Sequence, residues 1–168
     1  MSRRLMLLRH AKAVASTHSD GEAGDHARDL SERGRGEASA LGRRLQQRGM
    51  QPEVALVSGA LRTRRTWDLL APFTTPEPQL VVSDRLYLAS IGELRAMLRE
   101  TSDDVASLIL VGHNPGLHEL ALNLAGHDGD HAGLPAGLPT CTLIGFEVSG
   151  RWSDLGPGTT SNLMMMRP

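Results

Sequence analysis

The chain has 168 residues, of which 40% are hydrophobic, and a formal net charge of -1. These values are typical of one globular domain, 1–168, that is large enough to bury a core of its own. A near-neutral charge argues against a general basic surface of the kind that nucleic acids or anionic membranes require, and with 3% aromatic residues the chain has few side chains on which bases could stack. We therefore expect no nucleic-acid partner and no membrane partner.

The cysteine content and the first residues indicate the compartment. Cys141 is the one cysteine and cannot form an intramolecular disulfide, which suits a reducing environment. Two arginines precede the apolar residues 5–8, a pattern that superficially looks like the start of a signal peptide. The apolar run ends at Arg9 and His10, which is too short for an export signal or a membrane span. We predict a buried first strand, 5–8, in a cytoplasmic protein.

Short apolar runs then alternate with amphipathic stretches, which is typical of an α/β domain. A polar loop is expected over 13–29. It is followed by Ser31, as the N-cap of a helix that ends at Gly49. Residues 54–57 are predicted to form a second buried strand, and 62–70 a helix.

The second half of the chain continues the alternation. Six elements are predicted in order: a short strand at 80–82, a helix at 91–99, the clearest buried strand at 108–111, a helix at 117–124, and strands at 140–148 and 162–166. The segment 126–139 is expected to be a loop rich in Gly, His and Asp. We therefore predict a three-layer α/β/α sandwich whose central sheet is mainly parallel, with one antiparallel strand.

Three of the predicted strands lead into residues that can perform chemistry. The first leads into Arg9 and His10, the second into Ser58 and then Arg62, and the clearest one into His113. Because the carboxyl ends of parallel strands share one edge of a sheet, where ligands bind, we expect two arginines and two histidines to meet there.

Such a group of residues suits a phosphate. Arginine presents planar donors that match phosphate oxygens, and neutral imidazole is a competent nucleophile near neutral pH. Phosphoryl transfer needs in-line positioning and neutralisation of the charge on the equatorial oxygens. Two arginines with a second, protonated histidine can supply that neutralisation, so we expect neither a metal nor a cofactor.

The motifs around these residues resemble those of the histidine phosphatase superfamily, and more narrowly the short SixA-type phosphohistidine phosphatases. In chain order the matching segments are Leu-Leu-Arg9-His10-Ala11, Ser58-x-x-x-Arg62-x-x-x-Thr66 and Gly112-His113-Asn114-Pro115-Gly116. Two segments support the match: Asp25-x-x-Arg28-Asp29-Leu30-Ser31-x-Arg33-Gly34 and Leu86-Tyr87-Leu88-Ala89. The resemblance spans nearly the whole chain and implies a phosphoglycerate mutase-like fold.

Carried over residue by residue, the resemblance implies that His10 accepts the phosphoryl group. It implies that Arg9, Arg62 and His113 bind phosphate and assist catalysis, and that Arg28 is a further residue of the substrate groove. Arg28 could equally be a solvated loop arginine.

Two departures from the superfamily are visible. Ala11 stands where many members have Gly, although a small residue still lets the backbone pass close to a ligand. Relatives that cleave alkoxide esters place a carboxylic acid near the site, and no equivalent is found at 86–90. Glu93 is better explained as a residue in the first turn of a helix, where the helix dipole favours it.

The missing acid favours a substrate with a good leaving group. Phosphohistidine releases an imidazole, whose conjugate acid has a pKa of about 6.5, whereas an alkoxide usually needs a proton donor. The favoured partner is therefore a phosphorylated protein. A phosphatase for small phosphate monoesters and a non-catalytic phosphate- or phosphopeptide-binding module stay open. A nucleotide-binding Rossmann domain is disfavoured because no Gly-rich turn follows the first strand.

Other reactive residue types have simpler explanations. The run His127-Asp128-Gly129-Asp130-His131 fits no closed zinc pattern and is expected to be a solvated loop. His26 and His118 are expected at the surface. Cys141 is expected to be a small buried hydrophobe rather than a nucleophile.

Overall fold

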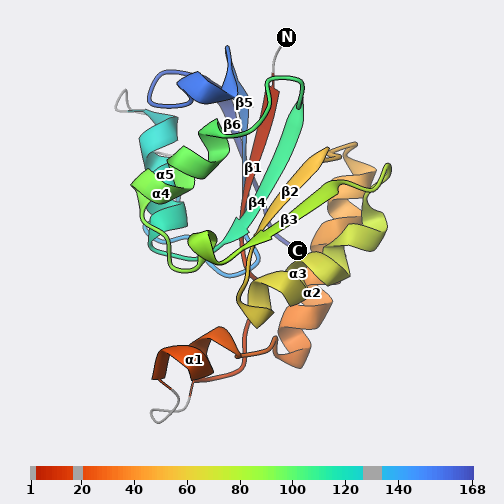
Figure 1. Ribbon diagram of the computed structural model, residues 1–168. Helices are drawn as coiled ribbons and strands as arrows, with labels where there is room; N and C mark the ends of the chain where they lie inside the picture. The colour runs from red at the N-terminus through yellow and green to blue at the C-terminus, as the bar shows by residue number, and fades with distance from the viewer. Residues whose placement is uncertain (1–2, 17–20, 127–133) are drawn as a thin grey trace.

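The computed structural model describes residues 3–16, 21–126 and 134–168 and is built on a six-stranded sheet (Figure 1). The strands are β1 (Arg3–Arg9), β2 (Val54–Ser58), β3 (Gln79–Ser83), β4 (Ser107–Gly112), β5 (Leu143–Val148) and β6 (Thr160–Met166). Their order is β3-β2-β4-β1-β5-β6. The first four are parallel, β5 pairs antiparallel with β1, and β6 pairs antiparallel with β5. β5 therefore runs against the other five strands, as predicted.

Helices cover both faces of the sheet (Figure 1). They are α1 (Gly21–His26), α2 (Glu32–Gln47), α3 (Leu61–Leu70), α4 (Ile91–Arg99) and α5 (Gly116–Ala125), with short 3-10 turns η1 (Ala71–Phe73), η2 (Asp84–Leu86) and η4 (Trp152–Asp154). Met6 and Leu8 of β1 pack in one core with α2 and α3, whereas Leu5 and Leu7 pack in the other core with α4 and α5. Since alternate residues of a strand face opposite sides, β1 joins the two cores, and the predicted three-layer sandwich is confirmed.

Capping residues place the ends of two helices where the sequence indicates. Ser31 begins α2, and its Oγ accepts a hydrogen bond from the backbone N of Gly34 at 3.1 Å. Ser90 and Glu93 form a capping box at the start of α4. The Glu93 side chain thus accepts from the Ser90 backbone, which confirms its expected place in the first helical turn.

Two segments differ from the prediction. The expected loop 13–29 contains the short helix α1, which buries none of its residues and so carries no hydrophobic periodicity that could reveal it. The strand expected at 140–148 begins only at Leu143, because the backbone of Cys141 has a φ of +54° and turns there. Cys141 is buried, as expected.

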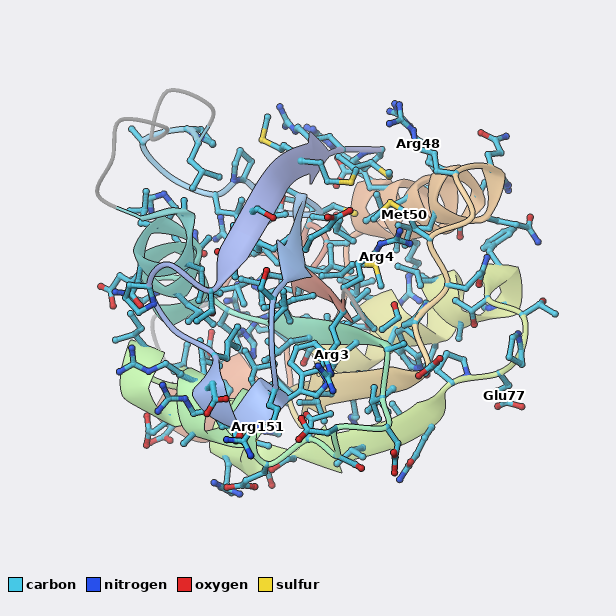
Figure 2. All side chains as sticks on the ribbon, turned by 90° about the horizontal axis from the view of Figure 1, so that it is seen from above. Arg3, Arg4, Arg48, Met50, Glu77 and Arg151 are labelled. Carbon is cyan, nitrogen blue, oxygen red and sulfur yellow. The ribbon has the colours of Figure 1, made fainter. Side chains whose placement is uncertain are left out.

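The two ends of β1 have different surroundings. His10 follows its carboxyl end, on the side where α1 lies in Figure 1. At the opposite edge, Figure 2 shows Arg4 near Met50 and Arg48; these three residues line a surface hollow together with Phe146 and Met164. In the described part of the chain, no helix is long and apolar enough to cross a membrane.

Candidate active site

His10 is held by the backbone just after β1 and is 7% exposed. Its Nδ1 lies 2.8 Å from the carbonyl oxygen of Ala11. A carbonyl can only accept a hydrogen bond, so Nδ1 carries the proton and Nε2 of the neutral ring keeps a free lone pair. The backbone N of Ala11 donates in turn to Thr66 Oγ1 at 3.0 Å, which anchors this turn to α3.

The surroundings keep His10 neutral. Burial, followed by the positive charges of Arg62, Arg9 and Arg28, lowers the pKa of His10 to about 4 against the opposing effect of the bond to the Ala11 carbonyl. The ring is therefore unprotonated at neutral pH, as a nucleophile requires.

His113 follows β4, and its ring centroid lies 5.2 Å from that of His10, with the ring planes tilted by 55°. Its Nε2 lies 2.8 Å from Ser58 Oγ, at the end of β2. Burial, followed by His10 and the charge of Arg62, lowers the pKa of His113 to about 2. The expectation of a protonated second histidine is therefore wrong for this structure, because a buried cation beside an arginine is unfavourable.

Arg62 lies in the first turn of α3 and is 2% exposed. Its Nη1 donates to the backbone O of Asp25 at 2.6 Å, and its Nη2 to Asp25 Oδ2 at 3.0 Å. These two contacts compensate the charge of a guanidinium that is almost fully removed from water.

Arg9 is the last residue of β1, and its Nη1 donates to the carbonyl of Leu138 at 2.6 Å. Burial, followed by the charge of Arg62, lowers the pKa of Arg9. The effect of one guanidinium on the other shows that they share one region, where an anion between them would relieve their repulsion.

Arg28, after α1, is also part of this region. Its Nε donates to Asp25 Oδ1 at 2.9 Å and its Nη1 to the carbonyl of Val14 at 3.0 Å. Its positive charge contributes to the lowered pKa of His10. The structure thus brings all five residues singled out in the sequence to the carboxyl ends of the strands.

Asp25 and Tyr87 complete the site, although sequence reasoning gave neither of them a role. The Tyr87 hydroxyl donates to Asp25 Oδ2 at 2.6 Å, and the Tyr87 ring lies edge-on to His113 at 5.5 Å. Burial would raise the pKa of Asp25, but the bond from Tyr87 and the contacts of Arg62 and Arg28 lower it to about 2. The signal that could have found Asp25 is its place three residues before Arg28, within a segment that already matched the family.

One carboxylate lies at the site, and it belongs to Asp25 of α1 rather than to the segment 86–90, where none was found in the sequence. Asp25 is ionised and already accepts hydrogen bonds from three side chains, so it is a poor proton donor.

Three buried nitrogens at the site have no hydrogen-bond partner within the described residues: Nε of Arg9, Nε of Arg62 and Nδ1 of His113. Buried polar atoms are normally paired, so these three nitrogens have hydrogen-bonding capacity that the described residues do not use. No group of three or more His, Cys, Asp or Glu among the residues that the structure describes could hold a metal ion. The run 127–131 lies outside those residues.

Comparisons with known proteins identify the family of the chain. Residues 5–114 match the histidine phosphatase superfamily (branch 1). An uncharacterized protein of Mycobacterium tuberculosis is 33% identical over 155 residues, covering 90% of this chain and 93% of that protein. A structure from Agrobacterium tumefaciens, assigned as the phosphohistidine phosphatase SixA, is 30% identical with a TM-score of 0.79, covering 88% of this chain and 93% of that one. The protein histidine phosphatase SixA complexed with tungstate shares the fold, with a TM-score of 0.75, 23% identity and 96% of each chain covered. The chain therefore belongs to the histidine phosphatase superfamily, branch 1, and has the fold of the SixA phosphohistidine phosphatases.

Proposed function

We propose that this phosphatase takes a phosphoryl group from phosphohistidine on a protein onto Nε2 of His10 and then passes it to water. Membership of the superfamily supports a phosphatase. The observation that carries the proposal is the state of His10: a neutral ring whose Nδ1 proton is held by the Ala11 carbonyl, beside three guanidinium groups.

In the first step, the Nε2 lone pair forms a bond to phosphorus while the bond to the leaving group breaks and its electron pair departs with that group. We propose that the guanidinium groups of Arg9 and Arg62, each of which has an unpaired Nε, donate to the phosphoryl oxygens. Since Ser58 Oγ can donate to Nε2 of His113, Nδ1 of His113 is left as a third donor without needing a second proton.

In the second step, water attacks the phosphorus of phospho-His10. Because the Ala11 carbonyl keeps the proton on Nδ1, the ring leaves as neutral imidazole rather than as an anion. The same hydrogen bond therefore prepares His10 as a nucleophile first and as a leaving group afterwards.

The low basicity of the leaving group supports phosphohistidine over alkyl phosphates as the substrate. Asp25 is ionised and held by three donors, so it does not itself protonate a departing alkoxide. Imidazole, with a conjugate-acid pKa of about 6.5, departs far more easily. The likeness to the structure assigned as SixA points the same way. We also propose a cytoplasmic location, on the ground of the single, unpaired Cys141.

The test is a parallel assay with a histidine-phosphorylated protein and a panel of sugar phosphates, in the presence of chelator. We expect turnover of the phosphohistidine protein that chelator does not change, and acid-labile radioactive label trapped on His10 but absent from His10→Ala. Faster turnover of the sugar phosphates would favour the monoester alternative. Phosphate binding without any label would favour the non-catalytic one, and inhibition by chelator would contradict a metal-independent mechanism.

A further inference from the structure

A surface hollow opens beside the phosphate-binding residues. It is lined by Glu22, Ala23, His26, Asp84 and Tyr87, which come from α1 and from the η2 turn with the residue after it. Because the ring of Tyr87 also lies edge-on to His113 at 5.5 Å, this hollow adjoins the site where the phosphoryl group would sit. A leaving group that points away from His10 has this hollow as a place to enter.

His26, the last residue of α1, is held at the wall of the hollow from two directions. Its Nε2 lies 3.3 Å from Asp84 Oδ1, and its ring packs edge-on against Tyr87 with centroids 4.8 Å apart. No hydrogen bond is found for its Nδ1 within the described segments. In an oriented proton donor of this kind, a carboxylate fixes one nitrogen of the ring and the other nitrogen stays free to donate. Nε2 and Nδ1 of His26 have this arrangement.

His26 also lies within electrostatic reach of the reacting groups. A positive charge on His26 contributes to the lowered pKa of His113. The other charged groups at the hollow are the carboxylates of Glu22 and Asp84, and Asp84 Oδ1 is the carboxylate oxygen that contacts the His26 ring, at 3.3 Å from Nε2. Asp25, next to His26 in the chain, is occupied by Arg62, Arg28 and Tyr87, so it does not compete for this role.

We propose that His26, oriented by Asp84, is the proton donor for the leaving group in the reaction proposed above, on which this inference rests. As the bond between phosphorus and the leaving nitrogen breaks, its electron pair goes to the substrate imidazole. The proton of His26 goes to the other ring nitrogen of that imidazole, which therefore leaves neutral. In the second half-reaction neutral His26 takes a proton from the attacking water, and the bond between His10 and phosphorus breaks with its pair on Nε2.

The effect of a proton donor on the rate depends on the basicity of the leaving group. A proton donor matters little when the leaving group is already stable as an anion and a great deal when it is strongly basic. The dependence of the rate on the leaving group therefore distinguishes a proton donor from a residue that only supports the fold.

The test compares p-nitrophenyl phosphate, which has a weakly basic leaving group, with phenyl phosphate, whose leaving group is more basic. In His26→Gln we expect kcat/KM for phenyl phosphate to fall about 100-fold, and that for p-nitrophenyl phosphate to fall by less than about 5-fold. In Asp84→Asn we expect kcat/KM for phenyl phosphate again to fall more than that for p-nitrophenyl phosphate, but by a smaller factor than in His26→Gln. His118→Gln is the matched control, because His118 lies on α5 and its Nε2 contacts the carbonyl of Pro135 rather than a residue of the hollow. In this variant kcat/KM for both substrates should stay at the wild-type level.

An equal loss on both substrates in His26→Gln, or no loss on either, would overturn the role of His26 while leaving the proposed function intact. Absence of turnover and of labelled His10 in the wild-type protein would instead overturn the proposed function. If His26→Gln fails to fold, the ratio of the two rates in Asp84→Asn decides, since a ratio equal to the wild-type value excludes the oriented donor.

Discussion

Asp25 connects the arginines of the site to one another. Its carboxylate pairs with Arg62 at 3.0 Å and Arg28 at 2.7 Å, and accepts from the Tyr87 hydroxyl at 2.6 Å. Arg62 is 2% exposed, so its charge depends on this partner for compensation. A single carboxylate therefore fixes the direction in which two guanidinium groups point.

For Asp25→Asn we predict a loss of about 3 kcal/mol in the free energy of unfolding, because the buried Arg62 charge loses its counterion. We also expect weaker binding of vanadate, since Arg62 and Arg28 lose their orientation. Urea unfolding and vanadate inhibition measure the two effects. Asp68→Asn, which removes an exposed carboxylate near Arg65, is the control and should change neither value appreciably. Unchanged stability in Asp25→Asn would show that Arg62 is compensated elsewhere.

The first turn of α2 packs directly on the backbone that follows the nucleophile His10. Both the N and the Oγ of Ser31 donate to the carbonyl of Lys12, at 2.8 Å and 3.0 Å. A Cβ added to Gly34 would lie 2.1 Å from that same carbonyl oxygen. Only a residue without a side chain allows α2 to approach this close, so Gly34 sets the distance between the helix and the turn after His10.

Gly34→Ala should therefore destabilise the protein by about 1–3 kcal/mol and lower kcat, because the backbone at 11–13 must shift. Gly36→Ala is a matched control in the same helix: nothing lies within 4 Å of its added Cβ, and we expect a gain of up to about 1 kcal/mol. Thermal unfolding together with phosphatase rates separates the two variants. Equal stability of both would show that α2 can move away without cost.

The elements also show where sequence reasoning succeeds and where it does not. Strands such as β4, in which every residue is buried, can be recognised in the sequence by an unbroken apolar run. The meeting of the site residues at the ends of these strands follows from the parallel topology. Helix α1 buries no residue, so no pattern marks it, and the contacts of Asp25 that depend on it were missed. The predicted protonation of His113 is wrong for a related reason. Burial and neighbouring charges decide the protonation state of this ring, and neither is visible in a motif.

Two buried neutral histidines, His10 and His113, make the free energy of unfolding depend on pH. The pKa of His10 is about 4 in the folded protein, below the value of about 6.5 expected for an unfolded chain. Between these pH values the unfolded state binds more protons than the folded state. The contribution of His10 to the free energy of unfolding is therefore fully present above about pH 6.5 and decreases as the pH falls towards 4.

We predict that His10 alone accounts for about 3 kcal/mol of this loss by pH 4, and that His113 adds to it. Urea unfolding at pH 7 and pH 5 in the wild type and in His10→Gln measures the contribution. The variant should lose less stability on acidification. An identical pH dependence in both proteins would mean that His10 titrates at its ordinary pKa in the folded state.

The place of β1 between β4 and β5 determines how strongly its amides are protected from exchange with solvent. Amides in a strand that is paired on both sides and packed into both cores exchange with solvent only when the molecule unfolds globally. Helix α1 has no apolar anchor, so its amides should exchange through small local openings. His10 therefore follows a strand whose amides should be among the best protected, whereas Asp25 and His26 lie on a helix whose amides should be among the least protected.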